Sequence, residues 1–341
     1  MFAYLDLLIS LLVILVAAEV FTNALEHLGQ RLGISEGMTG SVFAAVGTAL
    51  PETTVPLLAV FAGTANVRVN HEIGVGAILG APLMLSTLSL SLLALTTLRR
   101  RGIHGAFRPE PSGLTRDLNF FLMVFSVAGA ALFVPPQAAA LRVSIAIILV
   151  TSYFVYLLLT LRASSALVER GHATEAHAPV LLARIGLPEN LAVILAQLAL
   201  GLGLLVGGAK GFIYGVERIS EALGISALLL SLVIVPIATE LPEKVNSVLW
   251  VRRGKDTLAF GNITGAMVFQ GSLLTALGIT LTPWVPQREV LGAVGIALLA
   301  GLWLRWRVGR GDLRVWHLLV NGALYIAYIV LAFWMRTPGA G

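Results

Sequence analysis

Long apolar runs separated by short polar stretches make up most of the chain. A helix needs about 20 mostly apolar residues to cross a bilayer, and ten runs approach or exceed that length. Five of them precede a polar stretch at 162–189 and five follow it. They lie at roughly 4–24, 37–63, 72–97, 117–134, 139–161, 190–216, 225–251, 257–281, 288–306 and 314–334. The pattern predicts an all-α membrane protein with ten transmembrane helices and a linker between two sets of five.

The composition agrees with a lipid environment. Of the 341 residues, 57% are hydrophobic and 12% are charged, whereas soluble domains carry roughly 25% charged residues. The absence of cysteine excludes disulfides and thiolate metal sites. The net charge of +5 does not indicate nucleic-acid binding, because no basic patch is interleaved with aromatic residues. The N-terminal run lacks a positive flank and a small-residue cleavage site, so we expect a retained helix rather than a signal peptide.

The nine loops between the predicted spans carry a biased charge. The five odd-numbered loops hold 16 Lys and Arg residues, and the four even-numbered loops hold four. Basic residues favour the cytoplasmic side of a membrane. The bias therefore predicts cytoplasmic odd loops and two termini on the opposite side.

The chain contains an internal repeat. Residues 32–52, LGISEGMTGSVFAAVGTALPE, recur at an offset of 191 as residues 223–243, LGISALLLSLVIVPIATELPE, with nine of 21 positions identical. Both copies end in Thr-x-Leu-Pro-Glu. Because each half holds an odd number of predicted spans, the second copy is expected to lie upside down relative to the first. Interrupted apolar segments at matching positions of two halves indicate a transporter's binding site.

A second shared feature follows each copy. Gly76 and Gly80 align with Gly261 and Gly265 at an offset of 185. Each pair has the four-residue spacing that lets transmembrane helices approach closely. The repeat therefore covers about 32–85 in the first half and about 223–270 in the second.

Glu52 and Glu243 close the repeated motif. A carboxylate at mid-membrane costs at least about 2.5 kcal/mol, so it normally pairs, takes up a proton or binds a cation. The preceding proline frees a carbonyl one turn back, and broken helices of this kind suit hard cations. If the two halves bring both acids together, one cation or proton must leave before another can occupy the site. A purely structural role at a helix end is the competing interpretation.

The two Thr-x-Leu-Pro-Glu stretches, each followed by a Gly-x-x-x-Gly helix, resemble the alpha-repeats of the cation/calcium antiporter superfamily, of the sodium/calcium exchanger type. The resemblance implies two inverted five-helix repeats, over 1–161 and 190–341, joined by a cytoplasmic linker at 162–189. It implies alternating access by sliding of the first span of each repeat across a fixed core. The residues that it assigns to cation binding are Glu52, Glu243, Thr48, Thr239 and Asn262.

The sequence departs from the family pattern at several ligand positions. Serines and asparagines of the first repeat are replaced by residues without side-chain oxygens, namely Ala49, Ala77, Ala81, Pro82 and Leu85. In the second repeat Glu240 and Ala266 replace serines, and Gln270 occupies an Asn/Asp position. Glu240 and Gln270 are therefore secondary ligand candidates. Calcium takes 6–8 oxygen ligands, so the sequence leaves the identity of the ion open.

Glu240 and Lys244 add opposite charges four residues apart. On a continuous helix this spacing and order favour an ion pair, although Pro242 lies between them. Lys244 can pair with Glu240 structurally, act as a built-in cation that competes with the transported ion, or reach solvent. Asn246 and Ser247, one turn after Glu243, can line the ion path or link two helices.

The sequence thus predicts a cation antiporter of a prokaryotic inner membrane, exporting calcium or a related cation in exchange for sodium or protons. A proton-coupled exchanger of monovalent cations, and a non-transporting scaffold or sensor on the same fold, are the alternatives. The expected partners are inorganic cations and lipid, with no cofactor, and the sequence specifies no oligomeric state. No nucleophile triad, zinc-spaced histidine cluster or phosphate-binding loop is present, so no enzyme is predicted.

Overall fold

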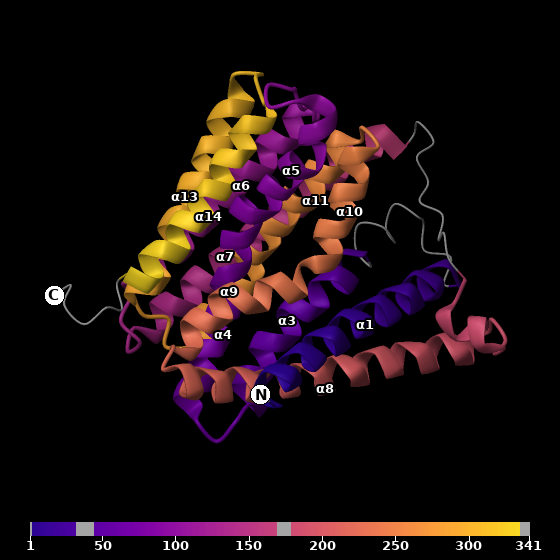
Figure 1. The fold of residues 1–341 in the computed structure, drawn as a ribbon, viewed down its shortest axis with the longest axis vertical. Coiled ribbons are helices and arrows are strands. Elements are labelled where there is room, and N and C mark those ends of the chain that lie inside the picture. The colour runs from indigo at the N-terminus through magenta and orange to yellow at the C-terminus, as the bar shows by residue number, and fades with distance from the viewer. Residues whose placement is uncertain (1, 32–43, 169–178, 335–341) are drawn as a thin grey trace. The chain divides into compact units, whose positions relative to one another are not determined.

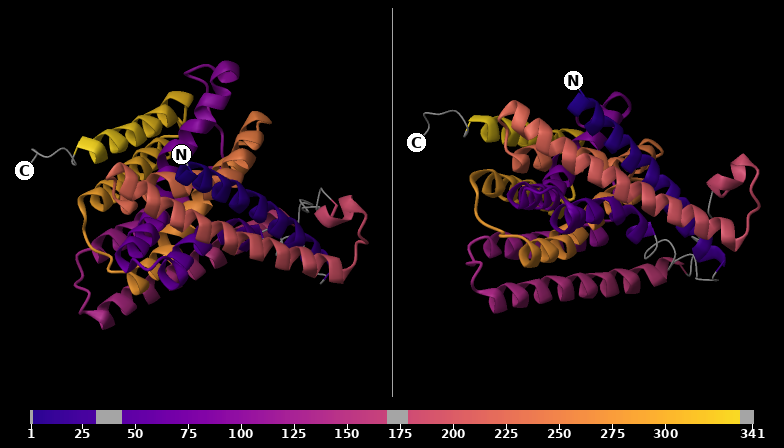
Figure 2. Two further views of the ribbon diagram at one scale, coloured as in Figure 1. Left: turned by 60° about the horizontal axis from the view of Figure 1, so that its bottom comes forward. Right: turned by 90° about the horizontal axis from the view of Figure 1, so that it is seen from below.

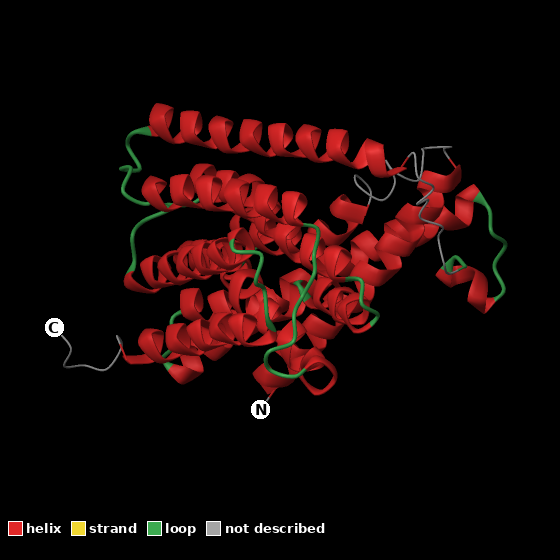
Figure 3. Cartoon of the chain, turned by 90° about the horizontal axis from the view of Figure 1, so that it is seen from above, coloured by secondary structure: helices red, strands yellow, loops and turns green. Residues whose placement is uncertain are grey.

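The structure, a computed structural model, describes residues 2–31, 44–168 and 179–334 (Figure 1). Within these ranges the regular structure is helical, and the β-type pairing is confined to an isolated bridge between Ala106 and Arg314 (Figure 3). The all-α class is therefore confirmed. Eight of the described helical stretches are long and apolar enough to cross a membrane, and shorter apolar helices occupy 52–62 and 227–237. The full count of ten crossings stays a prediction.

The chain divides into two compact units. The first comprises residues up to Asn70 together with Leu159–Ile225, and the second comprises His71–Leu158 and Ser226 onward. The described helices of the first unit are α1 (Phe2–Arg31), α3 (Ala44–Ala62), the 3₁₀-helix η3 (Leu181–Ile185) and α8 (Leu191–Leu223). Helix α4 and helix α7 each pass from one unit into the other.

Helices α1 and α8 of the first unit lie side by side (Figures 1 and 2). Three glycines of α8, spaced seven residues apart, face three residues of α1 with the same spacing. The order along α1 is reversed, so the two helices are antiparallel. A seven-residue repeat keeps one face of a helix against its neighbour, and small residues let two backbones approach in lipid. The facing pairs are Gly201 with Phe21, Gly208 with Ile14, and Gly215 with Leu7. The first predicted spans of the two halves thus run in opposite directions, as expected for inverted halves.

The second unit holds most of the helices. Its members from the first half of the chain are α4 (Val67–Met84), the π-helix η2 (Leu85–Ser89), α5 (Leu90–Arg101), α6 (Pro111–Ala131) and α7 (Ala139–Val168). Its members from the second half are α9 (Ala227–Thr239), α10 (Leu241–Arg252), α11 (Asp256–Phe269), the π-helix η4 (Gln270–Leu274), α12 (Thr275–Leu281), α13 (Arg288–Gly309) and α14 (Val315–Trp334).

The two π-helices reproduce the internal repeat in the backbone. Both ends of η2 and η4 are related by the offset of 185 that aligns the glycine pairs. A π-helix leaves the ordinary hydrogen-bond register, and polar side chains satisfy the carbonyls involved. Thr275 donates to the carbonyl of Gln270 at 2.9 Å, and Asn321 donates to the carbonyl of Ser86 at 2.7 Å. The resemblance between the halves therefore extends from sequence to local conformation.

The first glycine pair makes the close helix contact that its spacing predicts. A Cβ atom at Gly76 would lie 2.1 Å from the Ser231 hydroxyl, and one at Gly80 would lie 2.3 Å from the Leu232 carbonyl oxygen. Helix α4 therefore packs backbone to backbone on α9. The second pair differs, because a Cβ at Gly265 would make only an ordinary contact of 3.5 Å with the Tyr156 hydroxyl.

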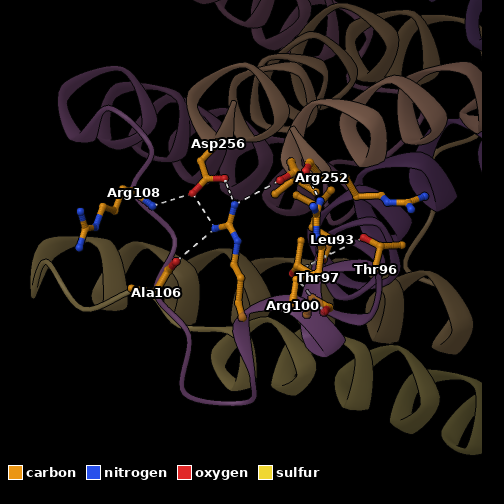
Figure 4. A network of polar contacts seen from close by, with 11 residues as sticks. Leu93, Thr96, Thr97, Arg100, Ala106, Arg108, Arg252 and Asp256 are labelled. Atoms are coloured by element: carbon orange, nitrogen blue, oxygen red, sulfur yellow. Dashed lines mark hydrogen bonds and ion pairs between the residues drawn. The ribbon is translucent and has the colours of Figure 1, made fainter. Parts of the chain in front are cut away.

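The third, seventh and ninth loops are joined within the second unit, and Figure 4 shows the polar network around Asp256. The Arg101 guanidinium donates to both carboxylate oxygens of Asp256, at 2.7 and 2.8 Å, which joins the third loop to the seventh. The Phe107 amide donates to the carbonyl of Leu313 at 2.8 Å, which joins the third loop to the ninth. These contacts agree with the alternation of sides that the charge bias predicts.

Even-numbered loops also pair within each unit. In the second unit Arg142 donates to the carbonyl of Pro283 at 2.6 Å, linking the fourth loop to the eighth. In the first unit Thr64 donates to the Glu217 carboxylate at 3.1 Å, linking the second loop to the end of α8 before the sixth loop. None of these described contacts joins an odd-numbered loop to an even-numbered loop.

Replacing Gly80 by alanine tests the backbone contact between α4 and α9. The added methyl group has no room beside the Leu232 carbonyl, and overpacking of this kind costs about 1–3 kcal/mol. We expect the Gly80→Ala variant to unfold at a lower temperature in detergent. Gly203 of α8 is exposed with open space around it, so Gly203→Ala is the control and is expected to leave the unfolding midpoint unchanged or slightly raised. Equal midpoints for the two variants would contradict the contact.

Candidate cation-binding site

Glu240 lies at a break between two helices of the second repeat. Helix α9 ends at Thr239 and α10 begins at Leu241, and Figure 1 shows the chain changing direction between them. Pro242 stands in the first turn of α10, where a missing backbone N–H costs no helical hydrogen bond. The second repeat is therefore broken at its Leu-Pro-Glu motif, as predicted. The first repeat is not, because α3 runs through residues 44–62 without interruption. Neighbouring helices can support a proline inside a transmembrane helix.

Gln270 is the partner of Glu240. The Glu240 side chain is fully buried, and its Oε1 atom accepts a short hydrogen bond from Nε2 of Gln270, the first residue of η4. Glu240 Oε2 and Gln270 Oε1 are also buried, and they accept no hydrogen bond from the residues that the structure describes. A buried polar atom without a partner carries a free-energy cost. These two oxygens are therefore available to a cation or to a proton.

Lys244 is buried one turn after Glu240. Its side chain is 6% exposed, so the interpretation in which it reaches solvent does not match the structure. The ammonium group donates to the carbonyl of Pro236 at 3.0 Å, and its charge acts on the Glu240 carboxyl group. A positive charge therefore already occupies the neighbourhood in which an incoming cation would meet Glu240.

The other described candidates of the second repeat, Thr239 and Asn262, make hydrogen bonds within and between helices. Thr239 is buried, and its hydroxyl donates to the carbonyl of Val235 at 3.2 Å, one turn back. Asn262 donates to the hydroxyl of Ser247 at 2.9 Å, which links α11 to α10. Of the two roles considered for Ser247, the structure shows the link between helices.

Glu52 is buried in α3 of the first unit, with 4% of its surface exposed. Thr48 belongs to the same helix and Glu243 belongs to α10. The side chains of Thr48, Glu243 and Asn246 lie outside the part of the chain that the structure describes. The convergence of Glu52 and Glu243 therefore stays a prediction.

The sequence pattern of the sodium/calcium exchanger protein family matches the chain twice, over residues 2–162 and 193–334. These stretches lie on either side of the polar segment between the two halves and together cover most of the chain. The chain belongs to the sodium/calcium exchanger family. The buried Glu240 and Gln270 of the second repeat therefore belong to a member of a family of membrane exchangers.

Individual relatives agree with this assignment. The chain is 26% identical over 337 residues to the inner membrane protein YrbG of Escherichia coli, with 96% of each chain covered. It is 27% identical over 145 residues to the sodium/calcium exchanger MaX1 of Methanosarcina acetivorans, with 40% of each covered.

Solved structures of exchangers share the fold. The H+/Ca2+ exchanger CAX superposes with a TM-score of 0.72 at 16% identity, covering 98% of this chain and 84% of that one. The sodium-calcium exchanger NCX_Mj superposes with a TM-score of 0.58 at 19% identity, covering 96% and 97%. The fold therefore occurs in proteins whose names specify proton coupling and in proteins whose names specify sodium coupling.

Two buried carboxylates of the second unit were not among the sequence candidates. Asp117 of α6 is 5% exposed, and Asp256, the first residue of α11, is 6% exposed. Asp256 is bound by Arg101, and Asp117 by two hydroxyl groups. Each stands at the edge of a predicted apolar run. An acid beside an apolar run was the available signal, but its partners lie on other helices.

A double-mutant cycle tests the pairing of Lys244 with Glu240. Removing one partner of a buried ion pair costs about 3–5 kcal/mol, because the other charge stays buried without compensation. We expect Lys244→Met to lower the unfolding midpoint strongly and the Glu240→Gln/Lys244→Met double variant to recover most of the loss. Lys210 of α8 is exposed, so Lys210→Met serves as a control within about 0.5 kcal/mol of wild type. Additive effects of the two substitutions would contradict the pair.

Proposed function

We propose that the protein is a cation antiporter that exports calcium or a related cation in exchange for sodium or protons. The observation that carries the proposal is the pair of buried oxygens on Glu240 and Gln270, which lie at the broken helix of the second repeat. Hard cations prefer carboxylate and carbonyl oxygens. Membership of the exchanger family supports the same conclusion.

Acids from both halves take part in this proposal. Glu52 and Glu243 close the two copies of the motif, and we propose that they bind the cation together with Thr48, Thr239 and Asn262. Glu240 and Gln270 supply further oxygens. Several carboxylates close together stay ionised only with a compensating cation or proton. Exchange follows, since one ion must leave before its counterpart binds. Access would alternate as α1 and α8, the first spans of the two halves, slide across the other helices.

Lys244 favours a second candidate within transport, a proton-coupled exchanger of monovalent cations. Its buried ammonium supplies one positive charge beside Glu240. The two repeats also lack several of the side-chain oxygens that the family pattern has at ligand positions. A site partly neutralised by lysine needs less charge from the transported ion than a site of carboxylates alone. A monovalent cation meets that requirement better than calcium does.

Ion flux into sealed vesicles tests the proposal. Purified protein in liposomes is given calcium, sodium or potassium, each with and without an opposing sodium or pH gradient. We expect gradient-driven cation uptake by the wild type and a loss of at least about 100-fold in Glu52→Gln and in Glu243→Gln, because each change removes a charged ligand. Calcium uptake driven by sodium or by protons supports the first candidate, and proton-driven uptake of sodium or potassium alone supports the second. Absence of uptake by the wild type and both variants alike would leave only a scaffold or sensor, and wild-type uptake by both variants would contradict the ligand assignment.

Cysteine labelling tests the proposed orientation. The chain has no native cysteine, so single cysteines at exposed loop positions report accessibility directly. We expect His104→Cys, in the third loop, to react only from the cytoplasmic side. Gln137→Cys and Gln287→Cys, in the fourth and eighth loops, are expected to react from the outside with an impermeant reagent. Labelling of all three from one side would contradict the predicted alternation.

A further inference from the structure

Asp117 joins three helices of the second unit. Its Oδ1 atom accepts a hydrogen bond from the Tyr156 hydroxyl of α7 at 3.1 Å, and its Oδ2 atom accepts one from the Thr264 hydroxyl of α11 at 2.7 Å. The residue is 5% exposed within a helix long and apolar enough to span a membrane. The residue stands at one end of its predicted apolar run, and a buried carboxylate there needs hydrogen-bond donors or a cation to offset the cost of its burial. None of the residues assigned to cation binding contacts it in these bonds.

Hydrogen bonds rather than a close ion pair define the surroundings of Asp117. Among the described residues, Arg116 is the cationic neighbour, with its Nε atom 3.9 Å from Oδ1 and its side chain 22% exposed. Glu110, at the start of α6, accepts hydrogen bonds from the amides of Ser112 and Gly113 and so caps its own helix. The two hydroxyl donors therefore set the position of the carboxylate, and the carboxylate in turn holds Tyr156 and Thr264.

Thr264 and Asn262 lie on different faces of α11, and Gln270, the first residue of η4, directly continues that helix. Successive residues of a helix are rotated by about 100°, so Asn262 lies about 160° from Thr264 and Gln270 about 120° from it in the opposite sense. The two ligand candidates are thus about 80° apart on one face of the helix. Thr264, which bonds Asp117, lies on the opposite face. On the face that carries the ligand candidates, Asn262 donates a hydrogen bond to Ser247 and Gln270 donates one to Glu240.

We propose that Asp117 is a positioning residue for transport. Its hydrogen bond to Thr264 fixes the rotation of α11 about its axis, and that rotation directs Gln270 toward Glu240. This inference rests on the proposed function, because it assigns Asp117 a role in forming the same cation site. Loss of the bond allows α11 to rotate, which weakens cation binding while leaving the ligands themselves in place.

Substitutions at both ends of the bond test the proposal. Asp117→Asn keeps the geometry, because its amide can donate to Thr264 while the Thr264 hydroxyl donates to the Phe260 carbonyl, 3.0 Å away. Asp117→Ala and Thr264→Val remove the bond, and Thr264→Ser retains it. With calcium, sodium and potassium as probes in the vesicle flux assay, we expect the apparent KM of the transported cation to rise about 10- to 100-fold in Asp117→Ala and Thr264→Val, the loss typical of a hydrogen bond to a charged group. Asp117→Asn and Thr264→Ser are expected to stay within about twofold of wild type.

A coupling measurement separates positioning from stability. Asn321 of α14 is buried and donates to the carbonyls of Ser86 in η2 and Ala300 in α13, so neither bond involves Asp117, Thr264 or Gln270. Asn321→Ala is therefore expected to lower the unfolding midpoint without changing KM. The effects of Asp117→Ala and Gln270→Ala on KM are expected to be non-additive, since both act on one contact.

Two outcomes would overturn the inference. An Asp117→Ala variant with a lowered midpoint but a wild-type KM shows a purely structural residue, and additive effects with Gln270→Ala exclude action through Gln270. Both outcomes are measured relative to a wild type that transports the cation. The proposed function is therefore retained in either case. Absence of flux in the wild type overturns the proposed function and this inference together.

Discussion

Charged side chains buried among lipid-spanning helices need partners from the protein, because the hydrocarbon offers none. Among the described residues of the second unit, Glu240, Lys244 and Asp117 each obtain a partner from another helix or another turn. Gln270 donates a hydrogen bond to Glu240, and the Pro236 carbonyl accepts one from Lys244. Two hydroxyl groups donate to Asp117. The same contacts that make burial tolerable therefore also fix which helices are neighbours and how they are rotated. At the candidate cation site two buried oxygens, Glu240 Oε2 and Gln270 Oε1, have no described hydrogen bond, and neither do several other buried polar atoms of the second unit.

The two halves share a framework but differ in chemistry. The π-helices η2 and η4 occupy equivalent positions, and the first spans α1 and α8 run antiparallel in the first unit. The ligand positions are not equivalent, because Leu85 opens the first π-helix and Gln270 opens the second. The first repeat instead contributes glycines that bring α4 against α9. One repeat thus supplies close packing where the other supplies oxygen atoms.

Much of the framework could be predicted because apolar length, glycine spacing and loop charge act locally along the chain. The helices, the α4 contact at Gly76 and Gly80, and the contacts between loops of the same parity agree with those predictions. The resemblance named Glu240 and Gln270 as candidates for one site, but their hydrogen bond could not be predicted, because the two residues are 30 positions apart on different helices. Asp117 was missed for the same reason, as its partners are on α7 and α11. The unbroken α3 was also unforeseen, since proline breaks a helix or not depending on support from neighbours.

The central proposal, which remains a prediction, is that acids from both halves bind the same cation. Cation-dependent stabilisation measures this without transport, since a ligand that binds only the folded state at 100 times its Kd adds about 2.7 kcal/mol. The unfolding midpoint is followed as calcium, sodium or potassium is raised, for the wild type, Glu52→Gln and Glu243→Gln. The account predicts that the cation that stabilises the wild type loses its effect in each single variant. Full stabilisation of both variants would contradict it.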